Sequence, residues 1–333
     1  MSLLSVLAAV MMATMLIVGY LVFIWWLDRY EREPLWVVLV TFVWGALGGT
    51  VFSCIVNTMI GNIVTAVVGT NVGKFVTTVM VAPTVEELIK GLIFLPLVFL
   101  GNNIDNRTDG LIYGAAAGLG FSCLENLWYY ANNFNPASPE ALYTIIFMRT
   151  MFTSLVHCAS SAMFGMAIGY ARHRSGALRW IVWPAVGYFF AVLNHATWNA
   201  LASVTGMLST SAASLAEFTL LLGVAMVLGV VVVMFAITQA SLHAEHKYIR
   251  RYLLEEAQRG VLPARHAEII PYWLRRSRSD WLPSQIDKQA YIKAATLLAF
   301  RHHQLEIAQG ERRQEYLEDI ANYRRQVRGL LGG

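Results

Sequence analysis

The sequence is poor in charged residues. Only 14% of its 333 residues are Asp, Glu, Lys or Arg, whereas 56% are hydrophobic and the mean hydropathy is +0.51. Soluble domains carry about 25% charged residues. The composition therefore excludes an ordinary soluble domain and predicts an integral membrane protein in a lipid bilayer.

Cysteine is scarce as well. The three cysteines, Cys54, Cys123 and Cys158, all lie in apolar segments, and their number is odd. They form neither a disulfide framework nor a pattern with metal-ligand spacing. No Lys or Arg precedes the first apolar segment, so the basic region of a cleavable signal peptide is missing. Internal repeats and low-complexity segments are also absent.

Long apolar segments, in contrast, are abundant. Each is at or above the ~20 residues that a helix needs to cross the hydrocarbon core. Residues 61–74 are less apolar and are interpreted as a loop, with room for a short re-entrant turn. The sequence therefore predicts an all-α, polytopic bundle of about seven transmembrane helices, at approximately 3–26, 35–60, 75–100, 110–130, 142–170, 180–204 and 215–238.

The charges divide the chain into two predicted domains. Residues 1–240 form the membrane bundle, with 9 basic and 10 acidic residues, and residues 241–333 form a tail with 16 basic and 11 acidic residues. The tail has helical periodicity and is predicted to be a soluble helical domain, with breaks near 260–263, 277–283 and 310. Positive and negative charges alternate along the tail and no nucleic-acid motif is present, so we expect no nucleic-acid partner.

The short loops indicate an orientation. With seven spans, loops one, three and five lie on the same side as the tail and carry nearly all of the basic loop residues, whereas the opposite loops carry only Lys74. Cytoplasmic loops are enriched in Lys and Arg. We therefore predict an extracytoplasmic N-terminus and a cytoplasmic tail.

Polar residues within the apolar segments are concentrated in four consecutive segments, the third to the sixth. A charge at the centre of a membrane helix costs about 2.5–3.5 kcal/mol, so such residues mark a functional site by default. Segments one, two and seven contain almost nothing comparable. The candidate residues are Glu86, Glu87, Lys90, Glu125, Asn126, Arg149, His157, His195 and Asn199. They can neutralise one another only by converging.

The spacing of small and polar residues indicates how these segments pack. Gly114, Gly118 and Ser122 follow one another at four-residue intervals, which lets a neighbouring helix approach closely. Pro83 removes a helical hydrogen bond one turn before Glu86 and can open the helix there. From the predicted spans, the polar cluster lies between the bilayer midplane and the outer face.

Two interpretations of the cluster compete. Glutamates and histidines from different helices suit a metal such as Zn²⁺, with a remaining carboxylate as general base. Alternatively, the glutamates form a buried ion-pair network with Lys90 and Arg149 that holds the helices in register. The number of charges favours function, because a structural role needs far fewer. Asn126 and Asn199 suit either a helix–helix hydrogen bond or a donor to a developing oxyanion.

Four motifs in this order resemble a known family. They are EExxK (Glu86, Glu87, Lys90), FxxxEN (Phe121, Glu125, Asn126), an Arg…His segment (Arg149, His157) and HxxxN (His195, Asn199). Over residues 86–199 the chain resembles the PrsW family of membrane proteases. That family belongs to a superfamily with the type II CAAX prenyl endopeptidases and Abi proteins.

The resemblance implies an intramembrane peptidase of a bacterial-type plasma membrane, proposed to be metal-dependent. It implies a first, extracytoplasmic cut in a single-pass substrate such as an anti-sigma factor, and essential roles for Glu86, Glu87 and His195. The CAAX branch has His where this chain has Glu125, which disfavours prenyl-protein processing. Related proteins often have Asp at the position of Asn199, and Asn is a poorer metal ligand than Asp. The expected ligand set is then Glu125, His157 and His195.

The sequence thus leads to an intramembrane protease in which Glu86 activates water. Glu87, Lys90, Arg149, Asn126 and Asn199 support catalysis, and the ligand set binds a divalent metal, with Zn²⁺ the first choice. In a metal-free variant, Glu86 and His157 activate water directly. Alternatives are a proton- or cation-coupled transporter, and a non-enzymatic membrane sensor or scaffold. The oligomeric state stays open.

Overall fold

The computed structural model describes residues 3–100, 103–135, 139–172, 174, 176–278, 280–307 and 311–332. These residues form helices and no strand, which confirms the all-α prediction. The chain divides into two compact units. The first comprises Met1–Leu27 and Glu33–Ala236, and the second comprises Asp28–Arg32 and Ile237–Gly333. The predicted boundary at residue 240 lies four residues from this division, within helix α11.

The first unit contains the apolar helices. In chain order they are α1 (Leu3–Leu27), α2 (Leu35–Val43), α3 (Thr50–Val68), α4 (Thr70–Val76), α5 (Ala82–Gly91), α6 (Phe94–Phe99), α7 (Arg107–Asn132), α8 (Pro139–Met148), α9 (Ser154–Arg172), α10 (Arg179–Leu208) and the first part of α11 (Ala213–Gln258). Three π-helical turns, η1 (Trp44–Gly49), η2 (Thr77–Val81) and η3 (Arg149–Thr153), join α2 to α3, α4 to α5 and α8 to α9.

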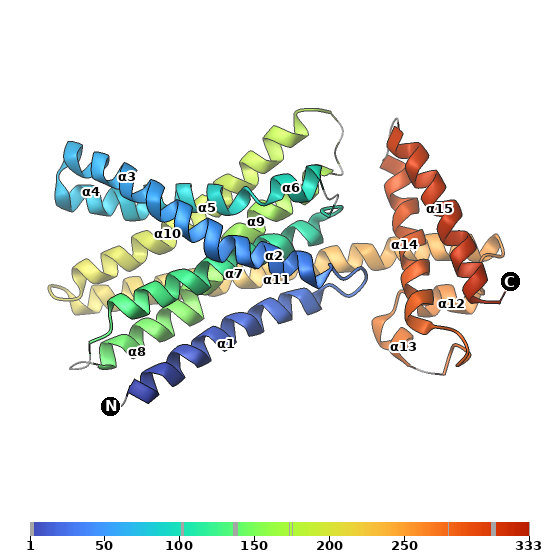
Figure 1. The fold of residues 1–333 in the computed structure, drawn as a ribbon, viewed down its shortest axis with the longest axis horizontal. Coiled ribbons are helices and arrows are strands. Elements are labelled where there is room, and N and C mark those ends of the chain that lie inside the picture. Colours follow the sequence, from blue (N-terminus) through green and yellow to red (C-terminus); the bar gives the residue numbers. More distant parts are fainter. Residues whose placement is uncertain are drawn as a thin grey trace. The chain divides into compact units, whose positions relative to one another are not determined.

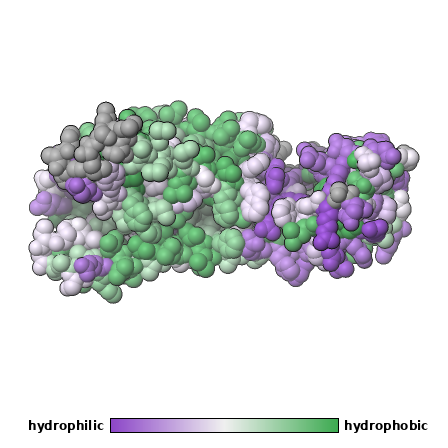
Figure 2. All heavy atoms as spheres, turned by 90° about the horizontal axis from the view of Figure 1, so that it is seen from below, coloured by the Kyte–Doolittle hydropathy of each residue, from purple (hydrophilic) through white to green (hydrophobic). Residues whose placement is uncertain are grey.

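Four helical stretches among the described residues are long and apolar enough to cross a membrane. They are Val6–Leu27, Leu35–Val68, Glu140–Arg172 and Ala213–Gln258. Large apolar side chains cover much of the visible surface of the first unit (Figure 2). The helices agree with an integral membrane protein, whereas the count of seven spans and the soluble tail stay predictions.

The loop predicted over residues 61–74 is wrong. Helix α3 continues to Val68 and α4 begins at Thr70, so only Gly69 turns the chain, with φ of 85°. The glycines that made this stretch look like a loop are contact points in a helical hairpin. A Cβ added at Gly73 would lie 2.5 Å from the Thr65 Cα, and one at Gly61 would lie 3.0 Å from Thr77 Cγ2.

The third predicted span is also shorter than expected. Helix α5 ends at Gly91, and a turn separates it from the short helix α6. Of the predicted breaks in the tail, that at 260–263 separates α11 from α12, and that at 277–283 follows α13. The break predicted near residue 310 lies outside the described residues.

Helix α7 is the centre of the first unit and is buried over most of its length (Figure 1). Its small residues allow this. A Cβ at Gly114 or Gly118 would lie 2.2 Å from a carbonyl oxygen of α9, and one at Gly120 would lie 1.9 Å from the Phe42 carbonyl oxygen of α2. The close approach predicted from the glycine spacing is confirmed, because only residues without a side chain permit these backbone contacts.

The second unit has a hydrophobic core of its own. It contains the end of α11, α12 (Ala264–Ile269), α13 (Trp273–Ser277), α14 (Lys288–Ile307) and α15 (Glu311–Leu330). Leu253, Tyr291 and Leu298 are completely buried in this core. The Tyr30 hydroxyl, from the connection between α1 and α2, donates to the Pro271 carbonyl at 2.9 Å. This hydrogen bond explains why Asp28–Arg32 belongs to the second unit.

Candidate functional site

A π-helical turn places the adjacent glutamates. In η2 the Ala82 N–H bonds to the Thr77 carbonyl, and the next residue, Pro83, has no N–H. The Thr78 carbonyl is therefore left without its usual helical partner, and the Asn199 side-chain amide donates to it at 3.0 Å. Pro83 opens the helix as the sequence indicates. The contact of Asn199 corresponds to the helix–helix role, one of the two expected for it.

Glu87 is completely buried and accepts hydrogen bonds on both oxygens. Its Oε1 lies 2.5 Å from Lys90 Nζ and 3.0 Å from His195 Nδ1, and its Oε2 accepts from the Ser161 hydroxyl at 2.8 Å. A carboxylate only accepts, so His195 Nδ1 carries the proton. The His195 Nε2 atom is thereby left with a free lone pair.

Lys90 connects Glu87 to the second histidine, His157. Its Nζ lies 3.3 Å from His157 Nδ1 and 4.6 Å above the Phe121 ring. Because an ammonium only donates, His157 Nδ1 accepts and Nε2 carries the proton, which it donates to Glu125 Oε2 at 3.0 Å. Gly49 makes room for this arrangement, since a Cβ there would lie 3.3 Å from Lys90 Cγ.

Glu125 and Asn126 hold the same arginine. Arg149 Nη2 lies 2.5 Å from Glu125 Oε2, and Arg149 Nε donates to Asn126 Oδ1 at 2.9 Å. The guanidinium also lies over the Tyr129 ring. The ion-pair network expected from the sequence is therefore present for Glu87 and Glu125, whereas Glu86 pairs with neither Lys90 nor Arg149. Arg149–Glu125–His157 joins η3, α7 and α9, and the Lys90–His157 contact connects α5 to them.

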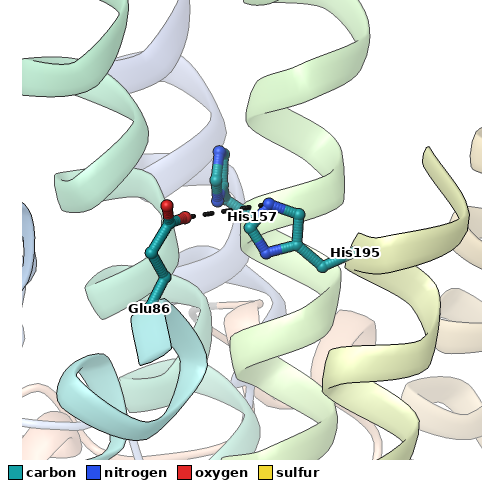
Figure 3. A group of neighbouring side chains, drawn as sticks. All are labelled: Glu86, His157 and His195. Atoms are coloured by element: carbon teal, nitrogen blue, oxygen red, sulfur yellow. Dashed lines mark ion pairs between the residues drawn. The ribbon is translucent and has the colours of Figure 1, made fainter. Parts of the chain in front are cut away.

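Glu86 differs from every other carboxylate in the cluster. Its Oε1 accepts a hydrogen bond from Asn57 at 3.2 Å, while its Oε2 is buried without a hydrogen-bond partner and lies 3.8 Å from His195 Nε2. Figure 3 shows this carboxylate pointing from α5 toward His195 of α10, with His157 of α9 beside them. One acidic oxygen thus remains available for chemistry.

Glu86, His157 and His195 form a group that fits a metal ion. One ligand atom from each lies within 4.8 Å of the others, and all three residues are buried. A carboxylate oxygen and two imidazole nitrogens suit Zn²⁺ or a similar divalent cation. The unpaired Glu86 Oε2 and the free His195 Nε2 supply two of these donors, and Glu87 orients His195 in the way that carboxylates orient metal-binding histidines. Binding by His157 would replace one of its two hydrogen bonds.

The predicted ligand set shares His157 and His195 with this group. Its third member, Glu125, lies beside the group and pairs with Arg149 through the oxygen that also accepts from His157. The structure therefore connects eight of the nine predicted site residues by direct contacts, while Asn199 lines the smaller cavity beside them. It also distinguishes Glu86 from Glu125 by their partners.

Two cavities reach this cluster. One, of about 660 Å³, lies among α5, α7, the α8–η3–α9 helix, α10 and α11, and the other, of about 1100 Å³, lies along α3 beside α4, η2 and α7. Glu86, Glu125 and Tyr129 line both cavities. Glu86 and Glu125 therefore lie at the walls of two cavities, although Glu86 and most residues around it are buried.

The sequence interpretation missed two residues of the cluster. Asn57 on α3 donates to Glu86, and Ser161 on α9 donates to Glu87. The expectation that the second apolar segment contributes almost nothing is therefore wrong. A four-residue spacing of Ser53, Asn57 and Gly61 was the available signal, since it marks one polar and small face on an otherwise apolar helix.

A family comparison agrees with this site. The profile of the PrsW family intramembrane metalloproteases matches residues 33–242, which include every residue of the cluster. The chain belongs to the PrsW family. The resemblance inferred from the four motifs is confirmed, and membership assigns the chain to the peptide hydrolases of the membrane.

Curated relatives share the family name. Protease PrsW of Oceanobacillus iheyensis is 23% identical over 167 residues, which are 50% of this chain and 67% of that protein. Protease PrsW of Geobacillus kaustophilus is 27% identical over 159 residues (47% and 64%), and that of Clostridioides difficile is 28% identical over 157 residues (46% and 61%). The matched region thus spans about two thirds of each relative. No solved structure matches the chain.

Proposed function

We propose that this PrsW-family protein hydrolyses a peptide bond of a membrane-anchored protein, with Glu86 as the residue that accepts the proton of the attacking water. The observation that carries the proposal is the Glu86 carboxylate. It is buried, keeps one oxygen without a hydrogen-bond partner and lines both cavities. A general base must have such an unoccupied oxygen within reach of water.

The neighbouring side chains orient His195 toward this carboxylate and offset the charges of the other two glutamates. Glu87 holds the Nδ1–H of His195, so that Nε2 faces Glu86 with its lone pair. Lys90 offsets the charge of Glu87, and Arg149 offsets that of Glu125. Of the three glutamates, Glu86 alone has no Lys or Arg partner, and the basic group nearest to its Oε2 is His195 Nε2 at 3.8 Å. The Arg149 guanidinium also lines the smaller cavity, where it can stabilise a developing oxyanion.

The family description implies a metal, and the donor set fits one. His157 and His195 would hold the ion together with Glu125, the set predicted from the sequence, if Glu86 is the base; Glu86 also lies within ligand distance of both histidines, and as the third ligand it would not be the base. A bound Zn²⁺ would act as a Lewis acid on the scissile carbonyl and increase the acidity of water. Asn199 is outside this set, because its amide is engaged by the Thr78 carbonyl.

The substrate class follows from the membrane setting. We propose a single-pass membrane protein, cut near the extracytoplasmic side as the first step of regulated intramembrane proteolysis, with an anti-sigma-factor-like protein as the example. Two arguments support this: the family assignment, and the predicted topology, in which the cluster lies outward of the bilayer midplane in a bacterial-type plasma membrane. The smaller cavity has the volume of an ordinary ligand pocket and can hold a few residues of an unwound segment.

The proposal is tested with a co-expressed single-pass substrate. We expect Glu86→Gln and His195→Ala each to reduce cleavage at least about 10²-fold, because removal of a general acid–base group has effects of this size. Glu217→Gln is the matched control, since Glu217 is exposed on α11 and lines neither cavity. Cleavage that survives both site changes at the control level would rule out the assignment.

Metal analysis of the purified protein separates the two carboxylate assignments. We expect a stoichiometric divalent metal in the wild type and in Asn199→Ala, and its loss in His195→Ala. Loss in Glu86→Ala but not in Glu125→Ala identifies Glu86 as a ligand, and the reverse identifies Glu125. Equal, near-zero metal content in all variants would instead support the metal-free reaction, in which Glu86 and His157 activate water.

A further inference from the structure

Four residues that line one cavity of the first unit each carry a buried polar atom with no hydrogen-bond partner in the protein, and three of them, Asn57, Thr77 and Glu86, line the smaller cavity as well. The four atoms are Ser53 Oγ, Asn57 Oδ1, Thr77 Oγ1 and Glu86 Oε2, and the cavity that all four residues line is the one of about 1100 Å³ along α3. Ser53 is only 1% exposed and Glu86 only 6%. A buried polar group left unsatisfied costs about 1–3 kcal/mol, so four such groups on one cavity indicate a ligand that hydrogen-bonds.

The helices present these groups together. Ser53 and Asn57 are four residues apart on one face of α3, and Thr77 and Glu86 come from η2 and α5. Gly61, one further turn along α3, lets η2 approach. The lining of the cavity continues along α3 to Thr65 and reaches Lys74 near the α3–α4 turn. A polar path therefore leads from the end of this hairpin to the Glu86 carboxylate.

The other face of α3 has the opposite character. Phe52, Met59 and Ile63 are 54%, 63% and 64% exposed, respectively, and none of them lines the cavity. In a bilayer such side chains face lipid. The cavity-lining face of α3 combines polar residues with the apolar Val51 and Ile55. Its unpartnered polar atoms favour an occupant that hydrogen-bonds over an acyl chain, since hydrocarbon offers them no hydrogen bond.

We propose that this cavity is a water-holding site, in which Ser53, Asn57 and Thr77 bind a cluster of water and supply it to Glu86. A buried water typically makes two to four hydrogen bonds, and about 30 Å³ is its share of liquid volume. The cavity provides both the polar atoms and the room. Supply of water matters in a membrane because the hydrocarbon core itself holds none.

The use of this water in catalysis rests on the proposed function. Hydrolysis adds the oxygen of one water to the carbonyl carbon as the C–N bond breaks. One proton passes from the water through Glu86 to the leaving nitrogen, and the other stays with, or leaves, the new carboxyl group. Each turnover consumes one water, which must be replaced along the α3 path.

The hydration of the cavity is tested without any substrate, by cysteine labelling in proteoliposomes. Cys54 lines the cavity and is exposed. A variant with Cys123→Ala and Cys158→Ala keeps Cys54 as its single thiol. In the control variant, Cys54 is also replaced by Ala, and Phe52→Cys supplies the single thiol. A second adjacent pair is Thr58→Cys, which lines the cavity, and Met59→Cys, which does not.

A charged, membrane-impermeant maleimide should label Cys54 and Thr58→Cys at least about tenfold faster than their controls, because the reactive thiolate is disfavoured in apolar surroundings. Rates are normalised to labelling of the denatured protein. Equal, slow rates at all four positions would overturn the proposal. Fast labelling that disappears when a single-pass substrate is added, but is unchanged by Ser53→Val, would also overturn it and assign the cavity to the polypeptide.

The Ser53 hydroxyl gives a second, matched test. We expect Ser53→Val to slow labelling of Cys54 and to lower the rate of cleavage severalfold at unchanged apparent KM, whereas Ser53→Thr, which keeps the hydroxyl, restores both. Labelling reports hydration even if the protein cleaves nothing. Failure of the protease assignment is therefore distinguishable from failure of the water site.

Discussion

At the scale of single residues, two adjacent glutamates have opposite surroundings. Glu87 receives hydrogen bonds from an ammonium, an imidazole and a hydroxyl, whereas Glu86 receives one from Asn57 and keeps one oxygen unpaired. A saturated carboxylate is held in place, and an unsaturated one can accept a proton. The two neighbours in the sequence therefore divide into an orienting residue and a candidate base.

This division predicts different consequences for stability. Glu87→Gln leaves the fully buried Lys90 ammonium without its counter-charge, and we expect a loss of about 3–5 kcal/mol, as for other broken buried ion pairs. Glu86→Gln should leave the melting temperature in detergent nearly unchanged. The double variant Glu87→Gln with Lys90→Met removes both charges and should melt above Glu87→Gln alone. A double variant that melts below the single one would contradict the assigned ion pair.

At the scale of the elements, π-helical turns adjoin the site helices. The turn η2 comes just before the helix of Glu86, and η3 just before the helix of His157. At η2 the Asn199 amide donates to the Thr78 carbonyl, and at η3 the Arg149 carbonyl accepts both the backbone N–H of Ser154 and, at 3.0 Å, its hydroxyl. Such turns are frequent at functional sites because they re-aim the side chains that follow.

The contact between α7 and α9 sets the distance between Glu125 and His157. A Cβ at Gly118 would lie 2.2 Å from the His157 carbonyl oxygen, so Gly118→Ala must push the two helices apart. We expect about 1–3 kcal/mol of destabilisation, the usual cost of overpacking, together with reduced cleavage. Gly229→Ala on α11 is the control, because it meets nothing within 4 Å and should be neutral or stabilising. Equal melting temperatures for both variants would contradict this packing.

At the scale of the whole molecule, the candidate site and the family match lie in the first unit and the start of α11. The family match ends at residue 242, so α12–α15 lie outside it, while the candidate site is entirely within the first unit. The second unit is organised around Glu256, a buried carboxylate bound by both Arg324 Nε and Nη2, at 2.7 Å and 2.6 Å, and by His302 at 3.0 Å. This ion-pair cluster connects α11, α14 and α15.

The Glu256 cluster predicts a pH dependence of the second unit. Burial alone would raise the pKa of Glu256, but hydrogen bonds from Arg324 and His302 lower it to about 2 from the usual 4.5. The stabilisation is therefore present above pH 4.5 and is lost as the pH falls toward 2. Hydrogen exchange in α15, corrected for intrinsic rates, should be faster in Glu256→Gln than in the wild type at pH 7, and the difference should shrink below pH 4.5. A difference independent of pH would contradict this origin.

Much of the fold was predictable from the sequence because bilayer physics requires long apolar helices and penalises isolated charges. Nine candidate site residues could be selected because charged and polar side chains are rare in apolar segments; their roles stay predictions. The α3–α4 hairpin was missed because glycines in a short, less apolar stretch predict a loop. Only the packing of the helices shows that Gly61 and Gly73 allow close contact between them. Asn57 was missed because one uncharged residue in an apolar segment gives a weak signal.

By itself, then, the sequence determined the membrane class and the family, and it selected the candidate residues, because composition and ordered motifs are properties of the chain. Only the tertiary structure decided which glutamate is free. Glu86 and Glu87 are adjacent in the chain and identical in chemistry. They differ only in the side chains that other helices bring to them, namely Lys90, His195 and Ser161 for one and Asn57 for the other.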